Sequence, residues 1–237
     1  MSESGSKVRD LRRRWKPHKE RLHELIPEHP TNIRFHRACS WLQRVEQLEG
    51  EEDGDLSLLS QWIAFNALYG QWSEPDQEPK RDIACWRSFL DKILQLDSGG
   101  RITEVLGDHK PLVMSILEDE YLSRFFWQEP GEIRARKSKK VKFEARTWYI
   151  EGRWTLVMDR LMERIYFLRC QLVHGAATYN SKLNRTAIRR CSTMLGHLLY
   201  AVLNVWVDHG ADEDWGAMCY PPMRKTAPLG VNGRVNR

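Results

Sequence analysis

An arginine and a histidine, Arg169 and His174, stand five positions apart at the end of an apolar, helix-like stretch. Arginine is a fixed cation whose planar group grips phosphate oxygens, and histidine takes or gives a proton near neutral pH. Together they suit cleavage of RNA by its own 2′-hydroxyl, a reaction that needs no metal ion. The spacing alone is weak evidence, because Arg13 and His18 share it. The alternative interpretation is a helix end flanked by favourable cations.

The local structure decides whether the two side chains can meet. The stretch from about Trp154 to His174 has helical spacing, and Gly175 is expected to end it in the left-handed conformation. Over five residues a regular helix rises about 7.5 Å and turns the side chains about 140° apart. We therefore expect the backbone to turn at His174 and to let the imidazole swing toward Arg169. The buried stripe of this helix is expected at Val157, Leu161, Ile165, Leu168 and Leu172.

Apolar residues recur at three- and four-residue spacing elsewhere too, and no segment alternates with period two. The sequence therefore predicts an all-α fold, an antiparallel bundle of four to five principal helices plus short additional helices. Asp55 is expected to cap one helix, whose apolar face carries Asn66. The aromatic stretch RFFWQEPG, residues 124–131, is expected to lie in the core.

Two basic segments flank this plan. Residues 1–30 are expected to be a basic N-terminal arm in which Pro17 breaks any long helix, and residues 216–237 a flexible C-terminal tail. Residues 31–215 form the helical domain between them. Within it, charge repulsion along residues 132–146 predicts an extended basic loop. The arm and the loop are either solvated or in contact with a phosphate backbone. The candidate RNA-binding residues of the loop are Arg134, Arg136, Lys137, Lys139, Lys140 and Lys142.

Composition limits the function classes. The net charge of +5 permits a nucleic-acid partner without requiring one. No secretory signal and no membrane-spanning run are visible, and the five cysteines lack close pairs, so we expect a cytoplasmic protein with reduced thiols. Neither a phosphate-binding glycine loop nor a zinc spacing is present, so no cofactor and no metal are expected. An acidic cluster is interpreted as a charged helix end: Asp208, His209, Asp212, Glu213 and Asp214.

The stretch YFLRCQLVHGAAT, residues 166–178, together with WIAFNALYG, residues 62–70, resembles a bacterial branch of the HEPN superfamily. The likeness extends loosely over residues 40–215. It implies an α-helical bundle, a metal-independent endoribonuclease that acts as a toxin or antiphage-defence effector, and a homodimer whose two motifs meet in one cleft. It further implies that Arg169 polarises the scissile phosphate and that His174 is the general acid or base.

The resemblance also assigns supporting roles and partners. Gln171 and Asn66 are candidates for support, and Cys170 occupies a position where the family usually has Asn, Asp or His. The implied partners are RNA, a second copy of the chain and an antitoxin or defence-system protein, with no membrane. The alternative, favoured by Cys170, is a non-catalytic module of this fold that binds a protein or a nucleotide.

Overall fold

Apolar residues at helical spacing form helices throughout the computed structural model, which describes residues 7–48, 54–180 and 182–221. Strand structure within these ranges is limited to one short hairpin and an isolated bridge, so the predicted all-α class is confirmed. The elements are α1 (Lys7–Leu25), α2 (Pro30–Gln47), α3 (Gly54–Tyr69), β1 (Trp72–Ser73), β2 (Glu78–Pro79), α4 (Asp82–Leu96), α5 (Arg101–Asp108), α6 (Lys110–Glu118), the 3-10 helix η2 (Glu120–Leu122), α7 (Arg124–Gln128), α8 (Glu132–Ile150), α9 (Trp154–Val173) and α10 (Arg185–His209).

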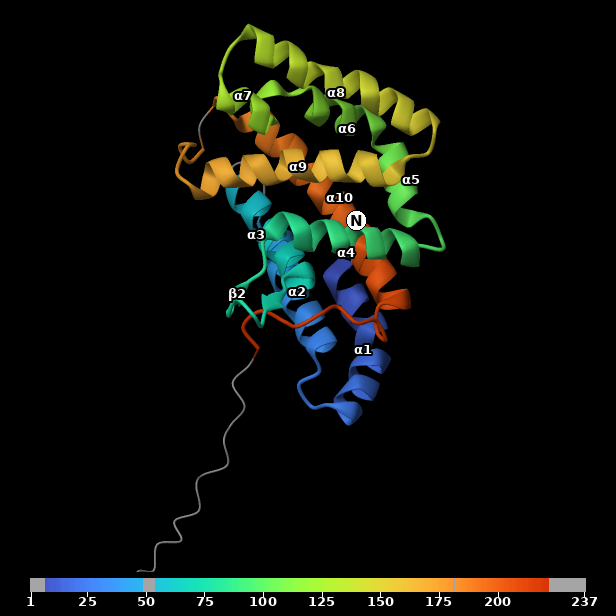
Figure 1. Cartoon of the computed structure of the whole chain (residues 1–237). Helices are drawn as coiled ribbons and strands as arrows, with labels where there is room; N and C mark the ends of the chain where they lie inside the picture. Colours follow the sequence, from blue (N-terminus) through green and yellow to red (C-terminus); the bar gives the residue numbers. More distant parts are fainter. Residues whose placement is uncertain (1–6, 49–53, 181, 222–237) are drawn as a thin grey trace, which may run out of the picture.

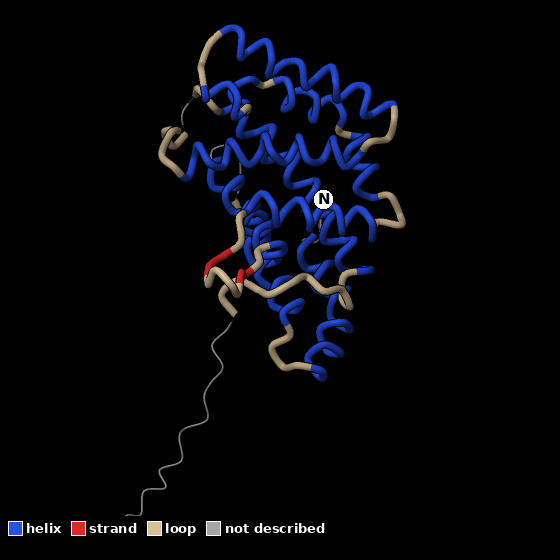
Figure 2. Tube along the Cα trace, viewed as in Figure 1, coloured by secondary structure: helices blue, strands red, loops and turns tan. Residues whose placement is uncertain are grey.

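Helix α10 forms the centre of the molecule and contacts α1, α3, α4, α5, α6 and α9. Helices α9 and α4 lie across it, α8 lies on the outer side of α9, and α1 and α2 pair at the opposite end (Figure 1). Figure 2 shows that short loops join most of these helices. Helix α10 buries apolar residues at three- and four-residue spacing along its length: Ile188, Cys191, Leu195, Leu198, Val202 and Val205. No helix within the described ranges combines the length and apolar character of a membrane span.

Helix α1 is part of the core, and the prediction that Pro17 would interrupt a helix there is wrong. Four apolar side chains on one face of α1 are buried, namely Val8, Leu11, Trp15 and Leu22. Two of its arginines hold acidic residues at the far end of α10: Arg14 pairs with Asp208 at 2.5 Å and Arg21 with Asp212 at 2.7 Å. The basic N-terminal segment is therefore a docked helix over residues 7–25 and not an arm.

The basic run of residues 132–146 is helical, so the predicted extended loop is also wrong. Acidic residues one turn away offset the repulsion, with Arg136 near Glu132 and Lys140 near Glu144. The helix has a core-facing side as well, since Ala145 is fully buried and Val141 packs against the core. Tertiary packing therefore outweighs the charge repulsion that the sequence pattern emphasised.

The C-terminal segment is hydrogen-bonded to the rest of the chain as far as Tyr220, in contrast to the predicted flexible tail from residue 216; residues 222–237 lie outside the described residues. The Arg34 side chain on α2 is 1% exposed and donates hydrogen bonds to backbone carbonyls at two places. At the end of α3 these are the carbonyls of Leu68 and Gly70, and in the C-terminal segment those of Trp215, Gly216 and Ala217. Arg34 thereby fixes the segment across the end of α3.

A stacked pair of histidines is expected to make stability depend on pH. The rings of His109, between α5 and α6, and His197, on α10, lie 3.9 Å apart. Burial lowers the pKa of His197, and the charges of His109 and Lys7 lower it further. Because the folded-state pKa of His197 is lowered, the unfolded chain binds a proton at this histidine more readily than the folded chain does. The histidine therefore costs no stability at pH values above its ordinary pKa near 6.5, and stability is lost as the pH falls below that value.

We therefore expect the free energy of unfolding to fall as the pH drops from 7 toward 5, and His197→Phe to make that loss shallower. The phenyl ring can keep the stack but does not titrate. Urea denaturation of both proteins across this pH range measures the difference. Burial also lowers the pKa of His29, so a residual dependence is expected to remain in the variant. If the free energy of unfolding fell equally with pH in the wild-type protein and in His197→Phe, His197 would not be the group responsible.

Candidate functional site

The end of helix α9 presents His174 at the surface. Gly175 adopts the left-handed conformation with φ 72°, as expected. The amide of Gly175 donates to the carbonyl of Leu172 at 3.3 Å, and the amide of Ala176 donates to that of Gln171 at 2.8 Å. This pair of bonds defines a Schellman cap, which ends the helix at a fixed residue. His174, the last residue before the turn, is exposed.

The loop that follows is anchored by a buried carboxylate. Asp55, in the first turn of α3, is 3% exposed. It accepts hydrogen bonds from the amide of Asn180 at 3.1 Å and from Arg185 at 3.0 Å. The prediction made Asp55 the cap of this helix, but Asp55 lies within its first turn, after Gly54, and its carboxylate binds the α9–α10 connection. Asp55 thereby holds the start of α10 and the loop after His174 against α3.

Arg169 lines a hollow that both motif stretches share, which we call the arginine hollow; its volume is about 670 Å³. The stretch 62–70 contributes Trp62, Asn66 and Gly70 to its wall, and α9 contributes Arg169. The Arg169 guanidinium lies 5.9 Å from the centre of the Tyr166 ring and 4.0 Å from the Cys170 sulfur. Among the described residues, the wall also holds three further cations, Arg34, Arg37 and Lys80, and one acid, Asp82.

His174 lines a second hollow, which we call the aromatic hollow; its volume is about 740 Å³. Its wall includes Tyr121 from η2, Trp127 from α7 and Phe167 from α9. Tyr121 is 53% exposed and Trp127 is 50% exposed. The expectation that residues 124–131 lie in the core is therefore wrong: no residue of this stretch is buried, and Phe125 and Trp127 are among the exposed large apolar residues.

Arg169 and His174 thus line different hollows on one chain. The cap turns the backbone as expected, yet His174 lines the aromatic hollow with Phe167, Cys170 and Gln171 and is not among the residues that line the arginine hollow. The divergence of about 140° that a regular helix imposes explains this placement, since the helix stays regular up to Val173. The geometry does not bring the two side chains together within one chain.

The supporting candidates divide in the same way. Asn66 faces the arginine hollow, and its side-chain oxygen lies so close to Gly70 that a Cβ there would be 2.9 Å away. Gln171 and Cys170 line the aromatic hollow. The Gln171 amide donates to the carbonyl of Tyr121 at 2.9 Å, which ties α9 to η2. Burial raises the pKa of Tyr166, and its contact with Cys170 raises it further.

The candidate RNA-binding residues lie on α8, whose stretch 132–146 has seven basic and two acidic side chains. Arg136 and Lys140 are exposed and belong to the ion pairs within the helix. Lys142 pairs with Glu118 on α6, so this cation has a structural partner. The side chains of Arg134, Lys137 and Lys139 lie outside the described part of the chain. Helix α8 packs against α7, the helix that carries Trp127.

The acidic cluster at the end of α10 is occupied by cations of the chain itself. Asp208 binds both Arg14 and Arg101, and Lys92 pairs with Glu213 at 2.7 Å. Burial alone would raise the pKa of Asp208, but the hydrogen bonds from Arg101 and Arg14 outweigh it and lower the pKa. The cluster therefore docks α1, α4 and α5 onto α10. In the described ranges no group of three or more His, Cys, Asp or Glu side chains is arranged to hold a metal ion.

Large apolar side chains stand exposed on the rim of the arginine hollow, a feature that the sequence pattern did not single out. Trp41 and Ile63 are each 40% exposed, Val173 is 52% exposed and Tyr220 is 68% exposed. Trp41 is exposed although Ala38 and Leu42, on the same helix α2, are fully buried. A contiguous cluster of exposed apolar side chains is typical of a surface that binds another molecule.

Comparison with protein families, with characterised proteins and with solved structures finds no match for this chain.

Proposed function

We propose that the chain is a metal-independent endoribonuclease of the HEPN type, acting in the cytoplasm as a toxin or antiphage-defence effector. Arg169 binds the scissile phosphate and stabilises the charge that develops on it. His174 moves the proton between the 2′-hydroxyl, the leaving oxygen and solvent. The products of such a reaction are a 2′,3′-cyclic phosphate and a free 5′-hydroxyl, so neither water nor a metal enters the cleavage step.

One observation carries the proposal. The two stretches that resemble the family, residues 62–70 and 166–178, are far apart in the chain but line one hollow, in which Arg169 and Asn66 share a wall. The same helix end exposes His174 through a glycine-dependent cap. A residue pair serving only as a helix terminus would not need an arginine directed into a cationic hollow.

The proposed reaction needs a second copy of the chain, because Arg169 and His174 line different hollows. In a twofold interface the same patch faces itself, so exposed Val173 on the rim would meet the partner's rim. His174 follows Val173 directly, and it would therefore be carried toward the other copy's arginine hollow. We propose that each reaction site consists of Arg169 from one copy and His174 from the other. The apolar rim supports this arrangement, because pairing would cover it.

A second candidate, a non-catalytic module that binds a protein or a nucleotide, is favoured by one observation. Cys170 offers only a weak sulfur contact to Arg169, at 4.0 Å, where the family usually has a polar group that orients the site. An antitoxin or defence-system protein would then occupy the apolar rim instead of a second copy. Catalytic assays separate the two candidates directly.

Metal removal is the simplest test of the reaction class. We expect the purified chain to cleave single-stranded RNA at an unchanged rate in excess EDTA and to leave 2′,3′-cyclic phosphate ends, because no step uses a metal ion. Gel analysis of a labelled RNA, with end-group analysis of the fragments, measures both properties. Complete loss of cleavage on chelation, restored by added Mg²⁺, would exclude the proposed mechanism. Absence of cleavage under every condition would favour the non-catalytic module.

A further inference from the structure

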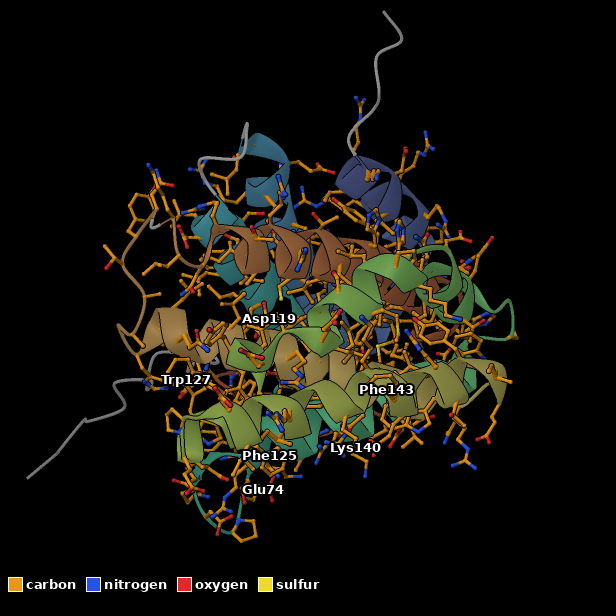
Figure 3. The ribbon with its side chains drawn as sticks, turned by 90° about the horizontal axis from the view of Figure 1, so that it is seen from above. Glu74, Asp119, Phe125, Trp127, Lys140 and Phe143 are labelled. Atoms are coloured by element: carbon orange, nitrogen blue, oxygen red, sulfur yellow. The ribbon has the colours of Figure 1, made fainter. Side chains whose placement is uncertain are left out.

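We propose that the aromatic hollow binds an unpaired nucleobase of the RNA, next to the phosphate on which His174 acts. This inference rests on the proposed function and adds to it a binding subsite and a preference for single strands. It begins from the position of the hollow: His174, Gln171 and Cys170 at the end of α9 form one wall, and Tyr121 and Trp127 belong to the same lining. Trp127 lies at the end of the molecule where α9 ends (Figure 3).

The aromatic rings are exposed but held in place. The Trp127 indole nitrogen donates to the carbonyl of Tyr121 at 2.8 Å, although half of the side chain is open to solvent. The Phe126 ring meets Trp127 edge to face at a centroid distance of 5.1 Å, with the planes 89° apart. The Gln171 amide donates to the same Tyr121 carbonyl at 2.9 Å. A fixed ring loses little side-chain entropy when a planar ligand stacks on it, which suits a preformed stacking site.

The chemistry of the surroundings selects the ligand. Every nucleobase has a flat π-face, and proteins bind single strands by stacking bases on aromatic side chains beside a cationic track for the phosphates. The aromatic hollow is lined by His174, Gln171 and Asn184, which offer polar groups to the edge of a base stacked on the rings. A purely apolar ligand would leave these polar groups unused. A base within a duplex presents only its edges, so it cannot enter the hollow.

The test measures binding apart from cleavage, in a His174→Ala background, by fluorescence anisotropy with a labelled 12-nucleotide single-stranded RNA of mixed sequence. Loss of one stacked base costs about 1–3 kcal/mol, so Trp127→Ala is expected to weaken binding about 5- to 150-fold. Trp127→Phe keeps a ring and is expected to bind within about threefold of its parent. The duplex of the same sequence is expected to bind the parent more weakly than the single strand does.

Phe125→Ala is the matched control. It removes a ring from the same short helix, where Phe125 is 41% exposed and lines a different hollow with Lys140 and Arg160. It is expected to leave RNA affinity unchanged. Equal affinities of the Trp127→Ala and Phe125→Ala proteins would overturn the inference. If Trp127→Ala does not fold, as judged by circular dichroism, Tyr121→Ala takes its place with the same expected loss.

The result also separates this inference from the proposed function. If the wild-type chain cleaves RNA while Trp127→Ala and Tyr121→Ala bind RNA as tightly as their parent, the base-binding subsite is refuted and the proposed nuclease activity is retained. If the wild-type chain never cleaves RNA but Trp127→Ala abolishes binding, the subsite stands and the catalytic role is refuted. Failure of the parent protein to bind any single-stranded RNA overturns the inference outright.

Discussion

Replacing His174 by alanine is expected to lower the rate of RNA cleavage about 10²- to 10⁴-fold, because a positioned general acid or base contributes that much. Arg169→Ala is expected to cost about 10²- to 10³-fold through lost stabilisation of the phosphate. Stability should change by less than about 0.5 kcal/mol in His174→Ala, since the side chain is exposed. Initial rates on a labelled RNA, together with thermal melts of each variant, provide the measurement.

The chain offers its own control for this experiment. His18 lies five residues after Arg13 in α1, at the same spacing as Arg169 and His174, but within a helix docked on the opposite end of the molecule. His18→Ala is expected to keep the cleavage rate within about twofold of the wild-type rate, because His18 lines neither the arginine hollow nor the aromatic hollow. If His174→Ala cleaved RNA as fast as His18→Ala, the assignment of the general acid or base would be wrong.

The second large effect is expected at Arg34. Its buried guanidinium satisfies carbonyls at the end of α3 and in the C-terminal segment. Burial lowers the pKa of Arg34 to about 10, so the group remains charged at neutral pH. Arg34→Met fills similar volume but leaves these carbonyls without their donor, and we expect it to lower the free energy of unfolding by about 3–5 kcal/mol.

Arg37→Met is the matched control for Arg34→Met. Arg37 donates to the next carbonyls of the segment, those of Cys219 and Tyr220, from a more exposed position. Because water can replace the donor there, we expect a loss of less than about 1 kcal/mol. Urea denaturation gives both free energies, and limited proteolysis should show the C-terminal segment released only in Arg34→Met. Equal losses in the two variants would show that Arg34 does not anchor the segment.

Regular apolar periodicity made the central helices predictable. The stripes of α9 and α10 lie where the spacing placed them, and Gly175 takes the left-handed turn that its position required. The errors occurred where charge or proline masked a second signal. In α1, Val8, Leu11, Trp15 and Leu22 keep helical spacing on the face opposite to exposed Pro17. In α8, glutamates one turn from the basic residues support the helix.

The site was predictable only in part, because which hollow a side chain enters depends on distant segments. The motif residues Arg169, Asn66 and His174 were identifiable from the sequence, but their division between two hollows follows from the packing of α3 and η2 on α9. Arg34 had a recognisable signal, since it precedes fully buried Ala38 and Leu42 by one and two turns on the same face. Trp127 had none, because exposure of an aromatic residue is set by its tertiary neighbours.

The most direct test of a site shared between two copies is complementation between inactive chains. Arg169→Ala and His174→Ala chains are purified separately, shown to cleave RNA at background rates, and then mixed in equal amounts or co-expressed with different tags. Random pairing makes half of the dimers mixed, and each mixed dimer restores one of its two sites, so we predict about a quarter of the wild-type rate. A mixture that stays at background, although size-exclusion chromatography and tag capture show mixed dimers, would contradict a site built from Arg169 of one copy and His174 of the other.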